Sequence, residues 1–102
     1  MSHSPLRIGA LGLGRAFTLM VPTFAQDARL RIVAGCDPRP EAMAQLQHDF
    51  GARMHTQAEQ LCADPDVEWV YVATPHGMHV DHVVLAASHG KHILLEKPMA
   101  LN

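Results

Sequence analysis

The sequence lacks a disulfide framework and any large excess of charge of one sign. Its two cysteines, Cys36 and Cys62, lie far apart and outside any CxxC spacing, so we expect two reduced thiols. Ten acidic and eight basic residues leave a formal net charge of -2, and this balance does not favour binding to nucleic acid or to an anionic membrane surface. These absences favour a cytoplasmic protein without either kind of partner.

Long apolar runs are missing as well, because glycine or charged residues interrupt each apolar stretch. Residues 1–5 are a short polar leader, so we expect neither a signal peptide nor a membrane span. Hydrophobic residues nevertheless make up 48 % of the chain and charged residues 18 %, which is typical of a globular protein. At 102 residues, the chain has the length of one small domain.

Strand-like and helix-like segments alternate along the chain. Strands are predicted at residues 6–11, 30–36, 53–56, 67–73 and 91–96, with helical segments between them. Several of these strands are apolar on both faces, a pattern typical of a parallel sheet that helices cover on each side. With right-handed crossovers, the alternation predicts an α/β fold of three layers.

Two helices carry more specific predictions. Pro22 lies inside the apolar stripe of residues 17–24, so we expect the first helix to kink there or to break into two turns. In the last helix, the apolar residues with helical spacing predict the face that packs on the sheet. These residues are Val80, Val83, Val84 and Ala87.

A glycine-rich turn, GALGLGRAF at residues 9–17, links the first strand to the first helix. Gly12 and Gly14 take the first two places of a GxGxxG fingerprint, where glycine makes the tight turn and lets the backbone approach a pyrophosphate at the helix N-terminus. Phe17 holds the third place, which is normally small. Asp37 ends the second strand, where the fingerprint has an acid for the adenosine ribose hydroxyls. The pattern predicts a Rossmann-like fold that binds a dinucleotide.

The residues around this acid bear on the choice of cofactor. A carboxylate at Asp37 repels the 2′-phosphate of NADP and favours NAD, although Arg39 could offset that charge and keeps NADP possible. Asp37 could also form an Asx turn before Pro38, and the two roles can coexist. In the first helical turn, Arg15 and Ala16 follow the glycines, and Arg15 either lies over the pyrophosphate or is solvated.

Polar residues also follow the fourth and fifth strands. Because ligands of open parallel sheets bind at the carboxyl ends of the strands, these residues should share the cofactor rim. A lysine there can exchange a proton with an alcohol or carbonyl oxygen during hydride transfer, so Lys97 is the candidate catalytic residue, with Glu96 beside it. The candidate cofactor-binding residues at this rim are Thr74, Pro75, His76, His79, Glu96 and Lys97.

Three histidines recur every three residues in the same region. His76, His79 and His82 do not have the i, i+4 spacing of a helical zinc site such as HExxH. We therefore expect no metal site.

Together, these motifs resemble a known family. The combination of GLGR at residues 12–15, Ala73-Thr74-Pro75 followed by His79, and GKHILLEKP at residues 90–98 resembles the glucose-fructose oxidoreductase, inositol dehydrogenase and MocA (Gfo/Idh/MocA) family of NAD(P)-dependent oxidoreductases. The resemblance covers essentially the whole chain. The stretch GLGRAFTLMVPTF, residues 12–24, is also similar to dehydrogenases of aromatic cis-dihydrodiols such as phthalate dihydrodiol.

The resemblance implies roles for individual residues. Lys97 would contact the nicotinamide ribose and the substrate and act in catalysis, with Glu96 and Pro98 as its family neighbours. The residues that match the cofactor fingerprint and the loop beside the pyrophosphate and nicotinamide ribose are Gly12, Gly14, Asp37, Thr74, Pro75 and His79.

The resemblance also implies a longer parent protein. Family members continue into a second α/β domain that supplies most substrate contacts and commonly the oligomer interface. Residues 1–102 would then be the NAD(P)-binding domain of a homo-oligomeric dehydrogenase for a sugar, polyol or cyclic dihydrodiol, truncated and inactive by itself. Two alternatives remain open here: a non-catalytic NAD-binding regulatory module, and a flavodoxin-like binding module in which Asp37 is accidental.

Overall fold

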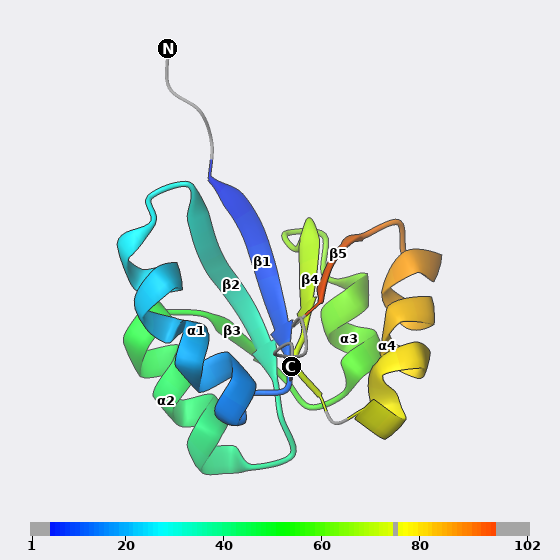
Figure 1. Cartoon of the computed structure of the whole chain (residues 1–102), viewed down its shortest axis with the longest axis horizontal. Helices are drawn as coiled ribbons and strands as arrows, with labels where there is room; N and C mark the ends of the chain where they lie inside the picture. Colours follow the sequence, from blue (N-terminus) through cyan, green and yellow to red (C-terminus); the bar gives the residue numbers. More distant parts are fainter. Residues whose placement is uncertain (1–4, 75, 96–102) are drawn as a thin grey trace, which may run out of the picture.

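The computed structural model describes residues 5–74 and 76–95, without the side chains of His76 and His79. Within these residues, strands and helices alternate as predicted (Figure 1). The elements are β1 (Leu6–Leu11), α1 (Arg15–Gln26), β2 (Leu30–Cys36), α2 (Pro40–Phe50), β3 (Arg53–His55), α3 (Ala58–Ala63), β4 (Trp69–Val72), α4 (His76–Ser88) and β5 (His92–Leu95).

The five strands form one parallel sheet in the order β3-β2-β1-β4-β5. The chain leaves β1 toward β2 and β3 and then crosses to β4 on the other side, which creates a topological switch point beside β1. In the sheet register, Leu11 pairs with both Cys36 and Val72. The loops that follow β1, β2 and β4 therefore leave the sheet side by side at the carboxyl end of the strands.

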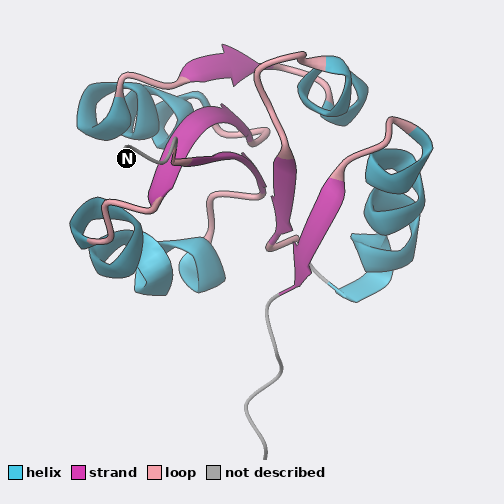
Figure 2. Cartoon of the chain, turned by 90° about the horizontal axis from the view of Figure 1, so that it is seen from above, coloured by secondary structure: helices cyan, strands magenta, loops and turns pink. Residues whose placement is uncertain are grey.

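Helices cover both faces of the sheet (Figure 2). On one face, α1 and α2 contribute Phe17, Phe24 and Leu46 to a core cluster with sheet residues that include Ile8 and Tyr71. On the other face, the buried cluster consists of Leu11, Ala34, Leu61, Cys62, Val67, Val70, Val72 and Ala86, from the sheet, α3, α4 and the segment before β4. The predicted three-layer α/β fold is confirmed.

Of the two outcomes predicted at Pro22, the break into two turns is wrong, and the kink stays a prediction. α1 runs from Arg15 to Gln26 as one helix that contains Pro22. Proline has no N–H to donate to the carbonyl of Thr18, four residues earlier. Both residues are exposed, so water can reach that carbonyl, and the apolar residues on the opposite side of α1 still pack on the sheet.

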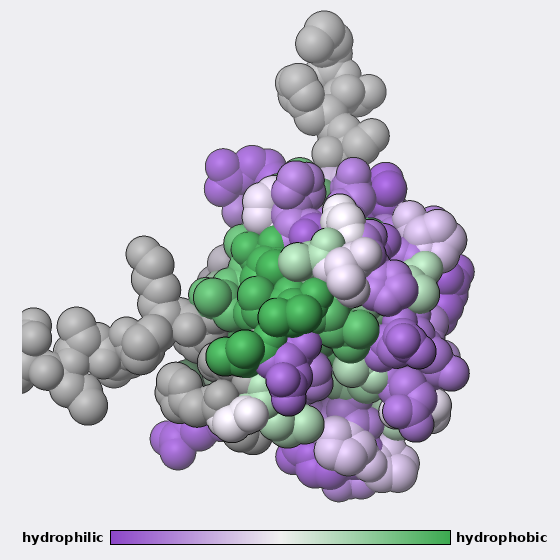
Figure 3. Space-filling view, turned by 90° about the vertical axis from the view of Figure 1, so that its right-hand side faces the viewer, coloured by the Kyte–Doolittle hydropathy of each residue, from purple (hydrophilic) through white to green (hydrophobic). Residues whose placement is uncertain are grey.

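α4 buries a different face from the predicted one. Ala86 is completely buried and Val83 packs against the core, whereas Val80 is 73 % and Val84 is 61 % exposed. Because α4 is apolar around most of its circumference, the spacing of its apolar residues does not identify the buried face. Exposed apolar surface consequently gathers on the side of the molecule that carries α4 (Figure 3).

The ends of α2 agree with the predictions. α2 begins at Pro40 and ends before Gly51, which caps it with a φ of 64°.

Cys36 and Cys62 are free thiols, as expected. Burial raises the pKa of both, that of Cys62 to about 11. Among the helices of the described residues, none is long and apolar enough to cross a membrane.

Candidate cofactor-binding site

The turn between β1 and α1 contains two glycines that the fold uses differently. Gly12 has a φ of 89°, and a Cβ atom there would lie 3.0 Å from the carbonyl carbon and oxygen of Ala73. Gly14 has a φ of -80°, and a Cβ atom there would meet only the guanidinium of Arg39, at 3.9 Å. The fold therefore requires glycine at position 12 but not at position 14, where the missing side chain leaves open space above the turn.

The N-terminus of α1 faces this open space. Gly14 is the N-cap and makes no side-chain capping hydrogen bond, and the first turn contains no acidic residue. The first N–H groups of a helix have no partner within the helix, and the helix dipole favours an anion beside them. Arg15, which is exposed, adds a positive charge to the same turn, and Ala16 follows it as predicted.

Phe17 does not fill the turn. Its side chain is 4 % exposed and its ring lies 5.8 Å from that of Phe24 and 6.3 Å from that of Tyr71, measured between centroids. The large residue at the third place of the fingerprint is thus accommodated between α1 and the sheet, and the space above Gly14 stays open.

Asp37 follows β2 and joins it to the glycine turn. Its Oδ2 accepts a hydrogen bond of 2.7 Å from the N–H of Leu13, and its Oδ1 accepts one of 2.9 Å from the N–H of Arg39. The second bond is the predicted Asx turn. Burial by itself raises the pKa of Asp37, but hydrogen bonds from Arg39 and Leu13 outweigh it and hold the pKa below its usual value. The side chain is an ionised acceptor beside the open space.

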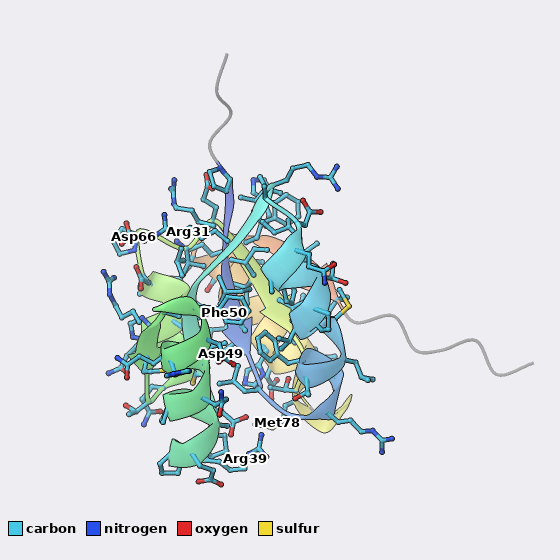
Figure 4. The ribbon with its side chains drawn as sticks, turned by 90° about the vertical axis from the view of Figure 1, so that its left-hand side faces the viewer. Arg31, Arg39, Asp49, Phe50, Asp66 and Met78 are labelled. Carbon is cyan, nitrogen blue, oxygen red and sulfur yellow. The ribbon has the colours of Figure 1, made fainter. Side chains whose placement is uncertain are left out.

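Arg39 lies on the exposed side of this acid. Its Nε is 3.0 Å from Oδ1 of Asp37, and its Nη2 is 3.4 Å from Oδ2. Figure 4 shows Arg39 at the carboxyl end of the sheet, opposite the end that carries Arg31 and Asp66. A positive charge therefore compensates Asp37 and borders the space above Gly14.

The loop after β4 lies beside the glycine turn at Gly12. The N–H of Ala73 donates to the carbonyl of Leu11 at 2.9 Å, which extends the pairing of β1 and β4 beyond the strand. Cγ2 of Thr74 would lie 3.0 Å from a Cβ at Gly12, and its Oγ1 is 2.9 Å from Nδ1 of His82. The role of His82 was not predicted, because sequence spacing does not show which residue of α4 reaches this loop.

Several predicted site residues are not located by this geometry. Pro75, Glu96 and Lys97 lie outside the described residues, as do the side chains of His76 and His79. β5 pairs Leu95 with Val72, so the described part of β5 ends level with β4. The roles assigned to these residues stay predictions.

A parallel sheet of this order, a glycine turn before an open helix N-terminus and an acid after the second strand define a dinucleotide-binding Rossmann domain. The chain belongs to the Gfo/Idh/MocA oxidoreductase family, whose NAD-binding Rossmann-fold domain matches residues 6–102. The predicted family and fold are thereby confirmed.

Relatives in this family include a dehydrogenase and a reductase, as well as proteins named glycosyl hydrolase family 109. The chain is 50 % identical over 97 residues to the 1-carboxy-3-chloro-3,4-dihydroxycyclo hexa-1,5-diene dehydrogenase of Comamonas testosteroni, a match that covers 94 % of this chain and 24 % of the relative. It is 34 % identical over 98 residues to the dTDP-3,4-didehydro-2,6-dideoxy-alpha-D-glucose 3-reductase of Saccharopolyspora spinosa, covering 95 % of this chain and 30 % of the reductase. The chain thus spans less than a third of the length of either relative.

Two solved structures with the same fold are complexes with a nicotinamide cofactor. The WlbA dehydrogenase of Bordetella pertussis, in complex with NADH and UDP-GlcNAcA, is 32 % identical with a TM-score of 0.83, and the match covers 94 % of this chain and 30 % of WlbA. The biliverdin reductase of Synechocystis sp. PCC 6803, in complex with biliverdin and NADP+, is 31 % identical with a TM-score of 0.82, covering 95 % of this chain and 31 % of the reductase. The fold therefore occurs with both forms of the cofactor.

Proposed function

We propose that residues 1–102 are the NAD(P)-binding domain of a longer dehydrogenase that transfers a hydride between NAD and a hydroxyl-bearing carbon of a small molecule. The observation that carries the proposal is the turn at Gly14, where an added Cβ atom would meet only the guanidinium of Arg39, at 3.9 Å. The glycine turn is bordered by the uncapped N-terminus of α1, by the carboxylate of Asp37, which accepts a hydrogen bond from the N–H of Leu13, and by the methyl group of Thr74 beside Gly12. A pyrophosphate and its adjoining ribose have the charge and hydroxyl groups that these borders match.

Each border has a separate task in this proposal. The backbone of Gly12–Ala16 holds the pyrophosphate, and the carboxylate of Asp37 accepts hydrogen bonds from the adenosine ribose hydroxyls. Thr74 and Pro75, together with His76 and His79 of α4, contact the cofactor on the other side. A bound nicotinamide would accept or donate the hydride, and these residues would hold the cofactor in position.

The chemical step is assigned to the end of β5. Lys97 would hydrogen-bond the reacting oxygen and exchange its proton as the hydride moves, and Glu96 would orient a ribose hydroxyl or tune the charge of Lys97. The similarity to a dehydrogenase named for a dihydroxylated cyclic diene supports a cyclic dihydrodiol as substrate, with sugars and polyols as the broader class. The remaining substrate contacts and a homo-oligomer interface are assigned to the rest of the longer protein.

NAD is the proposed cofactor, with NADP as a weaker ligand. The ionised Asp37 repels a 2′-phosphate, but Arg39 is already in place beside it to attract that group. Binding of NADP would require Arg39 to exchange its ion pair with Asp37 for one with the phosphate.

Calorimetric titration of NAD and of NADP into the purified chain tests this proposal. Asp37→Asn removes the charge and Asp37→Ala the acceptor. Asp27→Ala is the matched control, because it removes a half-buried acid that is paired with Arg29 at the far end of α1. We expect NAD to bind more tightly than NADP, both Asp37 variants to weaken NAD at least about tenfold, and the control to bind as the wild type does. Undetectable binding of both cofactors, or equal affinity in all variants, would contradict the proposal.

A further inference from the structure

The methyl and hydroxyl groups of Thr74 have different neighbours. Its methyl carbon Cγ2 is the side-chain atom near Gly12, 3.0 Å from where a Cβ would stand, and its hydroxyl Oγ1 is 2.9 Å from Nδ1 of His82. Both groups are on the same Cβ atom, so a single rotation about χ1 moves them together. A residue that hydrogen-bonds the hydroxyl therefore also determines whether the methyl lies against the glycine turn.

His82 is well placed to hold that hydroxyl. It belongs to α4 and lies one helical turn before Ala86, so the two residues share a face of the helix. Ala86 is completely buried against the sheet, and His82 is half-buried. The imidazole is consequently attached to a helix that is itself anchored in the core, whereas Thr74 belongs to a loop.

We propose that His82 is a positioning residue for the cofactor site. It holds the Thr74 hydroxyl, keeps the methyl against Gly12 and thereby sets the distance between the β4 loop and the glycine turn. The inference rests on the proposed function, because it requires a dinucleotide to occupy the space above that turn. His82 touches no cofactor atom in this proposal and acts only through Thr74.

The first test needs no cofactor. Three-bond couplings from the backbone nitrogen and carbonyl carbon to Cγ2 of Thr74, measured by NMR on the isotope-labelled chain, report its χ1 rotamer. We expect a single rotamer in the wild type and in His82→Asn, which keeps a polar group near Nδ1, and averaging over rotamers in His82→Leu. His89→Leu, at an exposed histidine just after α4, is the matched control. A single rotamer in His82→Leu would overturn the proposal.

The second test is titration of NAD into the same variants, together with Thr74→Val, which keeps the shape of threonine but lacks the hydroxyl. We expect His82→Leu and Thr74→Val each to weaken NAD about fivefold, as one net hydrogen bond would, and the double variant to be no weaker than either. His82→Asn should recover most of the affinity, and melting temperatures without NAD show whether a variant is merely less stable.

The outcomes separate this inference from the proposed function. Unchanged NAD affinity in His82→Leu, or additive losses in the double variant, would overturn the role of His82 while leaving the proposed function intact. A wild-type chain that shows the expected couplings but binds no NAD would instead refute the proposed function, and the assignment of His82 to a cofactor site with it.

Discussion

Substitution by alanine should affect stability at Gly12 and NAD affinity at Gly14. At Gly12, the backbone has a φ of 89°, which costs a residue with a side chain about 1–2 kcal/mol. The new Cβ would also lie 3.0 Å from the backbone of Ala73, which must shift to make room. We expect Gly12→Ala to lower the free energy of unfolding by about 2–3 kcal/mol and the melting temperature by about 10–20 °C.

At Gly14, the same substitution meets open space and an ordinary φ of -80°. Alanine caps a helix about 0.5–1 kcal/mol less well than glycine, but it restricts the unfolded chain and recovers about 0.4–1 kcal/mol. Stability should therefore change by less than about 0.5 kcal/mol. The methyl group would stand where the pyrophosphate approaches the backbone, so NAD affinity should fall at least about tenfold, the effect of about 1–3 kcal/mol of steric overlap.

Urea unfolding and calorimetric titration measure the two effects on the same samples. Trp69, the sole tryptophan, lies half-buried in β4, so its fluorescence reports unfolding. Gly51→Ala is the matched control, because Gly51 also has a positive φ, 64°, but a Cβ there would meet nothing within 4 Å. It should cost about 1 kcal/mol and leave NAD binding unchanged. The reasoning is refuted if Gly14→Ala destabilises as much as Gly12→Ala, or if it binds NAD as tightly as the wild type.

Three further predictions concern charge. Arg39→Ala should weaken NADP at least about tenfold but NAD by less than about threefold, because only NADP offers a phosphate to the guanidinium; equal losses by titration would count against this role. Burial raises the pKa of Asp64, but hydrogen bonds with His55 and the charge of Arg53 bring it below its usual 3.8. The ionised Asp64 therefore contributes its full stability above about pH 4, and this contribution is lost as the pH falls through the folded-state pKa. Asp64→Asn should flatten the acid side of a plot of melting temperature against pH. An unchanged slope would exclude this linkage. In the longer protein, Lys97→Ala should lower turnover at least about hundredfold while changing the NAD dissociation constant by less than about threefold, and parallel losses in both would exclude a catalytic role.

Much of this architecture follows from local patterns in the sequence. Apolar segments of strand length alternate with segments of helical period. This alternation favours a parallel sheet, because each helix carries the chain back to the end of the sheet where the preceding strand began. The bounds of β1, β2 and α2 follow from local signals such as the helix-starting Pro40 and the helix-ending Gly51. Asp37 could be assigned to the cofactor edge because the strand that precedes it ends there.

Tertiary structure decided which residues of each element matter. The buried face of α4 could not be predicted, because apolar residues surround the helix and only its contact with the sheet selects Val83 and Ala86 over Val80 and Val84. The difference between Gly12 and Gly14 depends on the distance to another strand's loop. The contacts of Asp37 with Leu13 and of Thr74 with His82 likewise join separate elements. Local propensity and periodicity carry no information on such distances, since they arise only when the strands pair and the helices pack.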